Sequence, residues 1–278
     1  MTERLPFIAI PLTPTRYPYA EKERRKAENS LGARNSLLTP HEHSNLPPSA
    51  SNPRISGIIM KSGAKADELT RGGVNNGMNS IRLTGRVTEL PVYDHSICGE
   101  AFYRMRAAVA RLSGSEDVLP VTVSERLLSG APEELLLKPV EISGQIRSYN
   151  RRAEDGSHLL ITVFAREISF PEEPSALPER NEAELEGVIC KPVVYRTTPF
   201  LREIADVLAA VPRRYGKCDH IPAIAWGRNA RFAEGLEVGA RVLLRGRLQS
   251  RQYNKLLPDG TGEERTAYEL SCSSIERI

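Results

Sequence analysis

Short apolar runs with a period of two fill the chain from Asn79 onward, and the same succession of runs occurs twice. Alternation of this kind is typical of β-strands with one buried face. The first succession predicts one helix within 124–137 and strands over 81–87, 101–111, 118–123, 140–148 and 159–170. The second predicts a short helix over 229–234 and strands over 185–194, 203–211, 221–226, 241–251 and 267–275. A repeat period of about one hundred residues is far too long for a solenoid, so we interpret it as a duplicated domain.

Five strands with a helix between the third and the fourth is the order of the OB-fold, a partly open Greek-key barrel that binds oligonucleotides or oligosaccharides. Gly85, Gly144, Gly187 and Gly246 recur in register inside the expected strands. Glycine permits the sharp bend or bulge that a small barrel needs to close. We therefore expect an all-β chain with two tandem five-stranded OB barrels, each with a short helix, over 79–170 and 181–278. Residues 171–180 contain three prolines and are the expected linker.

The first 78 residues are rich in Pro, Ser, Asn and charge, and no apolar period persists in them. Such a composition buries too little surface to offset chain entropy, so we expect a disordered segment over 1–78. An alternative also fits. Translation would start at Met78, which leads directly into the first expected strand, and residues 71–74 would be the reading of a purine-rich ribosome-binding sequence.

Composition and motifs exclude several classes of protein. The apolar runs reach only about eight residues, well short of the roughly 20 that a membrane helix needs. The N-terminus also lacks the flanks of a secretion signal, so we expect a cytoplasmic protein with no membrane partner. Four scattered cysteines form no CxxC pair, which argues against a zinc site or a disulfide framework. Five dispersed histidines and the absence of GxSxG, HExxH and Walker motifs give no support to an enzyme, a metal or a cofactor.

Local charge distinguishes the two expected domains. Residues 79–180 carry 12 basic and 15 acidic side chains, whereas residues 181–278 carry 15 and 13. Contacts with phosphate supply much of the affinity of a protein for nucleic acid. The second domain is therefore the better candidate to bind such a partner.

Three segments of the second domain carry a resemblance to a known family: VLAAVPR over 207–213, DHIPAIAWGRNA over 219–230 and GARVLLRGRL over 239–248, followed by Tyr253. They resemble the second strand, the third strand with its helix, and the fourth strand of the bacterial single-stranded DNA-binding protein family. The first domain resembles that family only weakly. The resemblance implies single-stranded DNA as the partner and, with two barrels per chain, a homodimer that presents four barrels. The family usually ends in a flexible acidic tail that recruits replication proteins. This sequence stops just after its last expected strand, which gives such recruitment no support.

The same resemblance implies that bases stack on Trp226, Tyr253, His220 and Tyr215. The residues indicate the same site by themselves, because a single-strand groove combines flat rings with cations that follow the backbone. The cations expected at the site are Arg196, Arg213, Arg214, Lys217, Arg228, Arg245, Arg247, Arg251 and Lys255. The candidates in the first domain are Tyr103, Arg104 and Tyr149. Phe102 and Tyr103 are adjacent in a strand, so one faces in and only the other can stack. The structural alternative is a buried Trp226 and arginines that only solvate an exposed face.

The function expected from these observations is non-catalytic binding and protection of single-stranded DNA in bacterial replication, repair or recombination. One alternative is an OB-fold protein-interaction scaffold, like a primosome accessory factor, with weak DNA binding. A second is an oligonucleotide-processing enzyme, for which the residues give no positive support.

Overall fold

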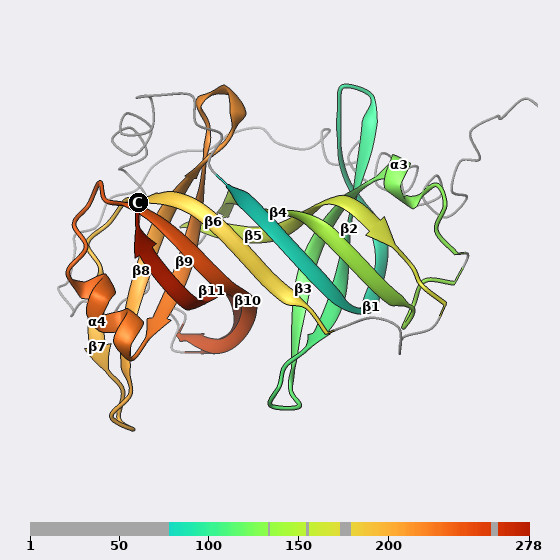
Figure 1. Cartoon of the computed structure of the whole chain (residues 1–278). Coiled ribbons are helices and arrows are strands. Elements are labelled where there is room, and N and C mark those ends of the chain that lie inside the picture. The colour runs from blue at the N-terminus through green and yellow to red at the C-terminus, as the bar shows by residue number, and fades with distance from the viewer. Residues whose placement is uncertain (1–77, 133, 154–155, 173–178, 257–260) are drawn as a thin grey trace, which may run out of the picture.

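The structure is a computed structural model that describes residues 78–278 except 133, 154–155, 173–178 and 257–260. The predictions for the segment 1–78 therefore fall, Met78 apart, outside the described residues. Strands dominate the chain, as Figure 1 shows. They are β1 (Asn79–Ile97), β2 (Glu100–Ala110), β3 (Glu116–Ser124), β4 (Pro139–Ala153), β5 (Gly156–Ser169), β6 (Asn181–Ile189), β7 (Val194–Thr197), β8 (Glu203–Pro212), β9 (Cys218–Trp226), β10 (Arg241–Leu256) and β11 (Gly262–Arg277). The helices are short: α3 (Glu125–Leu128), the 3-10 turn η2 (Arg214–Gly216) and α4 (Arg228–Glu234).

The strands of residues 79–170, here called the first half, close on themselves as a five-stranded barrel. The order is β2-β3-β5-β4-β1, and β1 is long enough to pair with β2 as well as with β4. The strands of residues 181–278, the second half, follow the corresponding order β8-β9-β11-β10-β6, with a further pairing of β6 with β8. Among the described residues, each half has one parallel pairing, and the two join corresponding strands, β3 with β5 and β9 with β11. The expectation of an all-β fold with little helix is confirmed.

Two local predictions were wrong. The expected strand over 185–194 ends at Ile189, and β7 begins only at Val194. Pro192 lies in the gap, where its missing N–H cannot join the ladder. The helix expected within 124–137 spans only Glu125–Leu128, because Gly130 and Pro132 lie within four residues of its end and both disfavour helix.

Close approach of backbone explains a glycine inside β10. A Cβ on Gly246 would lie 2.1 Å from the carbonyl oxygen of Ser271 on β11, and the pairing of the two strands is irregular at this residue. The corresponding Gly144 of β4 would place a Cβ 2.3 Å from the carbonyl oxygen of Phe164 on β5, where the pairing is irregular in the same way. These glycines therefore let neighbouring strands approach closely at corresponding places in the two halves.

Replacement of Gly246 by alanine should lower the free energy of unfolding by at least about 2 kcal/mol, because the added methyl must push backbone away from backbone. Gly130→Ala is the matched control, since a Cβ there meets no atom within 4 Å. Urea unfolding followed by circular dichroism measures both. A Gly246→Ala variant as stable as Gly130→Ala would contradict the prediction.

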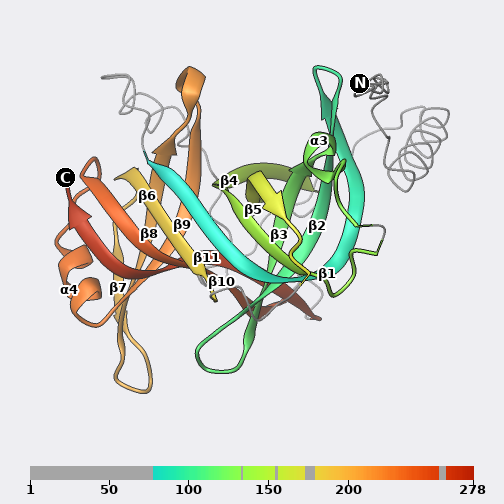
Figure 2. The same ribbon diagram turned by 45° about the vertical axis from the view of Figure 1, so that its right-hand side comes forward.

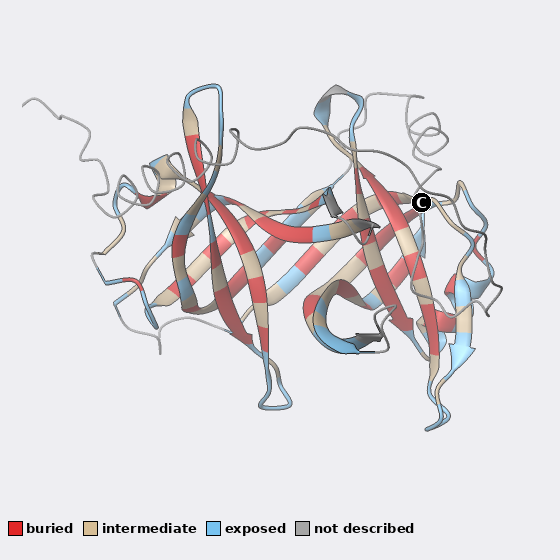
Figure 3. Ribbon diagram, turned by 180° about the vertical axis from the view of Figure 1, so that it is seen from behind, coloured by how far each residue is buried: buried red, intermediate tan, exposed pale blue. Residues whose placement is uncertain are grey.

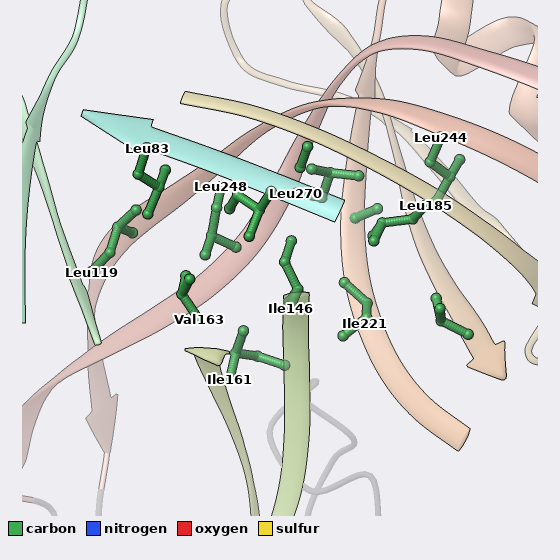
Figure 4. Packing of buried hydrophobic residues seen from close by; sticks show 14 of the residues in the cluster. Leu83, Leu119, Ile146, Ile161, Val163, Leu185, Ile221, Leu244, Leu248 and Leu270 are labelled. Atoms are coloured by element: carbon green, nitrogen blue, oxygen red, sulfur yellow. The ribbon is translucent and has the colours of Figure 1, made fainter. Parts of the chain in front are cut away.

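Alternation of buried and exposed residues along the strands forms the core, as the coloured bands of Figure 3 show. On β2, Tyr103 and Met105 join the core, whereas Phe102 and Arg104 face outward. The core is one continuous cluster that draws on both halves. Figure 4 shows side chains from each half in it, among them Ile146 of the first and Leu248 of the second. The two halves are therefore not separated by solvent.

Antiparallel pairing of β1 with β6 joins the two halves into one sheet, from Asn79 opposite Leu185 to Leu83 opposite Asn181. Both asparagines bridge backbone in the same way. The side-chain amide of Asn79 exchanges two hydrogen bonds with the backbone of Ile146, and that of Asn181 does the same with Leu248. The junction thus has an approximate internal twofold symmetry.

Two fully buried carboxylates hold the junction. Asp219 on β9 accepts hydrogen bonds from Arg213 of its own half, and from Arg147 (3.1 Å) and the main-chain N–H of Ser148 (2.5 Å) of the first half. A carboxylate between two guanidiniums is a strong, oriented contact.

Asp117 on β3, in the first half, makes the equivalent contacts with the second half. It accepts from Arg111 of its own half, and from Arg247 (3.0 Å) and the main-chain N–H of Ser250 (2.7 Å) of the second half. Figure 2 shows the long β10–β11 hairpin running beneath the first half, where these contacts form.

Among the described residues, no helix has the length and apolarity that crossing a membrane requires.

Candidate nucleic-acid interface

Trp226 lies at the end of β9 with its ring on the outside of the second half. Its neighbour Ala225 is in the core, so the alternation of the strand turns the indole outward, where 39% of it is exposed. The indole N–H donates to the hydroxyl of Ser271 on β11, at 3.2 Å. The ring is thus held by its edge, and the structural alternative of a core tryptophan is wrong.

Tyr253 offers a second accessible ring, on the β10–β11 hairpin. It is 38% exposed, and the guanidinium of Arg251 lies 5.8 Å from its centroid. Arg251 also approaches Glu269 at 3.5 Å, a partner that moderates its charge. The cation and the ring of this pair are both accessible to a strand of nucleic acid.

Three of the expected cations are exposed and have no carboxylate partner in the described part of the chain. Arg214 and Lys217 belong to the turn between β8 and β9, and Arg228 begins α4, two residues after Trp226. Because no acidic group offsets them, their charge is available to phosphate.

Other expected cations have carboxylate partners, and their prediction as free contacts with phosphate conflicts with the structure. Arg245 binds Glu184 and Glu276, both at 2.7 Å, and Arg196 binds Asp206 at 3.0 Å. The remaining two, Arg213 and Arg247, hold the buried carboxylates of the junction and are largely covered.

Tyr149 and His220 come from different halves, and both lie at the junction. The main-chain N–H of His220 donates to the hydroxyl of Ser148, at 2.8 Å. Arg213 lies over the ring of Tyr149, 5.4 Å from its centroid, and 41% of Tyr149 is exposed. Burial raises the pKa of the Tyr149 hydroxyl, an effect that the charge of Arg213 opposes, so the phenol is neutral at physiological pH.

The prediction of Tyr103 as a base-stacking residue was wrong. Only 1% of it is exposed, because it alternates with core residues of β2 and packs edge-on against Tyr93. Phe102 lies on the opposite face of β2 but is only 9% exposed, so neither residue of the pair presents an open ring. Arg104 is 58% exposed, with Asp94 at 3.6 Å. The side chains of Tyr215 and Lys255 lie outside the described residues.

Sequence reasoning also missed an aromatic group in the first half. His95 stacks on Phe102 with ring centroids 5.1 Å apart, and Phe102 contacts Phe164 at 5.8 Å. Arg166 lies over Phe164, 5.7 Å from its centroid. These residues come from β1, β2 and β5, and their spacing in the sequence carries no signal that they meet.

The described residues contain no cluster of three His, Cys, Asp or Glu side chains of the kind that holds a metal ion. What the exposed rings and unpaired cations of the second half can do is stack on flat groups and bind anions. That combination suits a single strand of nucleic acid.

Comparison with known proteins agrees with this chemistry. Residues 180–278 match the model of the single-strand binding protein family. Two solved structures of the single-stranded DNA-binding protein from Thermus aquaticus are similar to the chain. The wild-type structure is 23% identical to this chain with a TM-score of 0.55. The match covers 73% of this chain and 94% of the Thermus chain. A deletion mutant is 20% identical with a TM-score of 0.54, and the match covers 73% of this chain and 95% of the mutant chain.

A third similar structure is the dimeric N-terminal domain of PriB protein from Thermoanaerobacter tencongensis. It is 41% identical, covers 34% of this chain and 98% of that chain, and has a TM-score of 0.31. No curated protein matches the chain.

Proposed function

We propose that this protein, whose residues 180–278 belong to the single-strand binding protein family, binds single-stranded DNA through the outer face of its second half. The observation that carries the proposal is that the second half presents two exposed rings, Trp226 and Tyr253, and also carries exposed cations that no described carboxylate offsets. Family and geometry are independent of each other here, and both support the same partner.

In this mechanism bases stack on the rings while phosphates contact Arg214, Lys217 and Arg228. Every base has a flat face, so binding tolerates any sequence, and each stack contributes about 1–3 kcal/mol. Such a protein covers exposed strands during replication, repair or recombination and catalyses nothing. Each half is an OB barrel in this proposal, with the chain divided at the segment 171–180.

In this proposal, cations without a carboxylate partner contact phosphate and cations with such a partner do not. A salt titration tests this difference. Binding of a labelled oligo-dT of about 35 nucleotides, long enough for several sites of ~4–16 nucleotides each, is measured by anisotropy at several salt concentrations. Each phosphate contact adds about 0.7 to the slope of log K against log salt for a single strand. We expect Arg214→Gln with Lys217→Gln to lower that slope by about 1.4.

The matched control removes an arginine that already has a partner. Arg196→Gln with Asp206→Asn deletes the exposed ion pair of β7 and β8 and leaves the net charge unchanged. Its slope should equal that of the wild type. Failure of the wild type to bind at low salt would discard the proposal and favour the protein-interaction scaffold.

Two further parts of the proposal have their own tests. Labelled DNA incubated with the protein and a divalent metal should stay intact, whereas cleavage would favour the processing enzyme. The homodimer of four barrels stays a prediction, which light scattering checks as a mass of twice the 30.8 kDa chain.

A further inference from the structure

The aromatic group of the first half lies on its outer face, outside the main core cluster. Val163 and Ala165 of β5 belong to the core, so Phe164 between them points outward. Phe102 lies on the corresponding face of β2 but is only 9% exposed, because His95 and Phe164 pack against it. The His95 side chain at the end of the group is 38% exposed. The group is therefore a row of rings on the outside of the barrel, accessible at His95 and partly at Phe164.

Pairing of strands shows that Phe164 corresponds to a residue of the DNA-binding face proposed for the second half. In the first half Thr122 of β3 pairs with Phe164 of β5, and in the second Ile224 of β9 pairs with Ser271 of β11. Phe164 thus takes the place of Ser271, the hydroxyl that holds Trp226.

The residue that takes the place of Trp226 in the first half is Ser124. Ser124 lies opposite Phe102, as Trp226 lies opposite Ile204. The large ring and the small serine have therefore been exchanged between two neighbouring strands. Each half has a partly exposed ring at this level of its barrel, Trp226 on β9 in the second and Phe164 on β5 in the first.

Arg166 adds a cation that suits a nucleic-acid backbone. It lies over Phe164 and donates to the side-chain oxygen of Gln145, at 3.0 Å. Gln145 is neutral, and no carboxylate in the described chain pairs with Arg166. Its charge is therefore not offset, unlike that of Arg104, which has Asp94 beside it.

The position of this group also suits a strand that continues from the second half. Gln145 accepts a second hydrogen bond from Arg147, at 2.5 Å, and Arg147 reaches Asp219 of β9 at the junction. The group is thus linked to the junction by one chain of side-chain contacts.

We propose that His95, Phe102, Phe164 and Arg166, here called the Phe164 platform, form a second base-stacking site for single-stranded DNA. The inference rests on the proposed function and extends it to the first half of the chain. A strand held on the second half crosses the junction and places one further base against Phe164, with a phosphate near Arg166. Long strands use both sites, and short strands use the second half alone.

The test compares Phe164→Leu with the wild type on two labelled oligo-dT ligands, one of about 8 nucleotides, enough for one site, and one of about 35. Leucine keeps the apolar cover of Phe102 and removes the flat ring. We expect roughly tenfold weaker binding of the long ligand, the loss of about one stacked base, and unchanged binding of the short one. Phe232→Leu on α4, where the phenyl is 46% exposed, is the matched control and should bind both ligands normally.

Three outcomes separate the two proposals. If the wild type binds neither ligand, the proposed function fails. If the wild type binds both and Phe164→Leu matches it on the long ligand, the platform alone is overturned. An equal loss on both ligands would also overturn it, since the effect would then come from the second half.

A direct measurement places a reporter at the platform. In a Trp226→Phe background, Ser124→Trp with Phe164→Ser copies the arrangement of the second half and leaves one tryptophan in the chain. Stacking of a base should quench its fluorescence on addition of the long ligand. A signal that the long ligand leaves unchanged would contradict the proposal.

Discussion

Removal of both accessible rings of the second half, by Trp226→Ala with Tyr253→Ala, should weaken binding of single-stranded DNA by about 100-fold or more. Each stacked base contributes about 1–3 kcal/mol, and two such losses add when the sites are separate. Both rings are about two-fifths exposed, so their removal should leave the core intact. Anisotropy titration at one fixed salt concentration measures the effect.

The control for this variant is Phe232→Ala, which removes an equally accessible ring from α4. Its affinity should stay within about twofold of the wild type, a difference of ~0.4 kcal/mol. The salt dependence of the double variant should remain, because its cations are unchanged. Wild-type affinity in the double variant would place the binding face elsewhere on the molecule.

The sequence predicted the parts of the fold that depend on local pattern. Period-two alternation found the strands, and the repeated order of strands indicated the duplication, because both signals are written along the chain. Pro192 shows the limit of that reasoning. The strand expected over 185–194 ends at Ile189, and Pro192, which has no N–H, lies in the gap before β7.

The accessible rings of the second half could be predicted for the same reason. Trp226 ends an apolar strand and Tyr253 precedes a turn-rich segment, and both lie on the outside of the structure. To choose between Phe102 and Tyr103, one must know which face of β2 packs against the core, because adjacent residues in a strand point to opposite faces. The local sequence does not indicate which of the two faces is buried.

Ion pairs at the junction were missed, although the repeat held a signal for them. Arg213 and Asp219 are spaced as Arg111 and Asp117 are, at corresponding places in the two halves. An arginine and a carboxylate that recur together in both copies suggest a partner rather than a free phosphate contact. Arg247 had no such signal, because its partner Asp117 is far away in sequence.

The Phe164 platform could not be predicted at all. Its rings come from three strands, and the exchange of ring and serine is visible only once β3 is known to pair with β5. Parallel pairing between distant segments is a property of topology, which alternation along one strand does not encode. The acidic composition of residues 79–180 therefore concealed a candidate binding face.

Neutralisation of the buried carboxylate Asp219 should destabilise the whole molecule. Asp219→Asn keeps the shape of the side chain but leaves Arg147 and Arg213 without their counter-charge, at 16% and 20% side-chain exposure. Breaking a buried ion pair in this way costs about 3–5 kcal/mol. In the described chain, β1 and β6 form the only strand pairing between the halves. Loss of the Asp219 ion pairs beside it should therefore loosen one half from the other.

An exposed ion pair provides the matched control for this last prediction. Asp206→Asn removes the carboxylate that binds Arg196 on the surface, where both side chains are about half exposed, and should cost less than about 1 kcal/mol. Urea unfolding, followed by circular dichroism and by the fluorescence of Trp226, measures both variants. A large loss for Asp219→Asn together with two separate transitions would show that Asp219 couples the halves into one unit. Equal small losses in the two variants would mean that the buried carboxylate adds no more to stability than a surface pair.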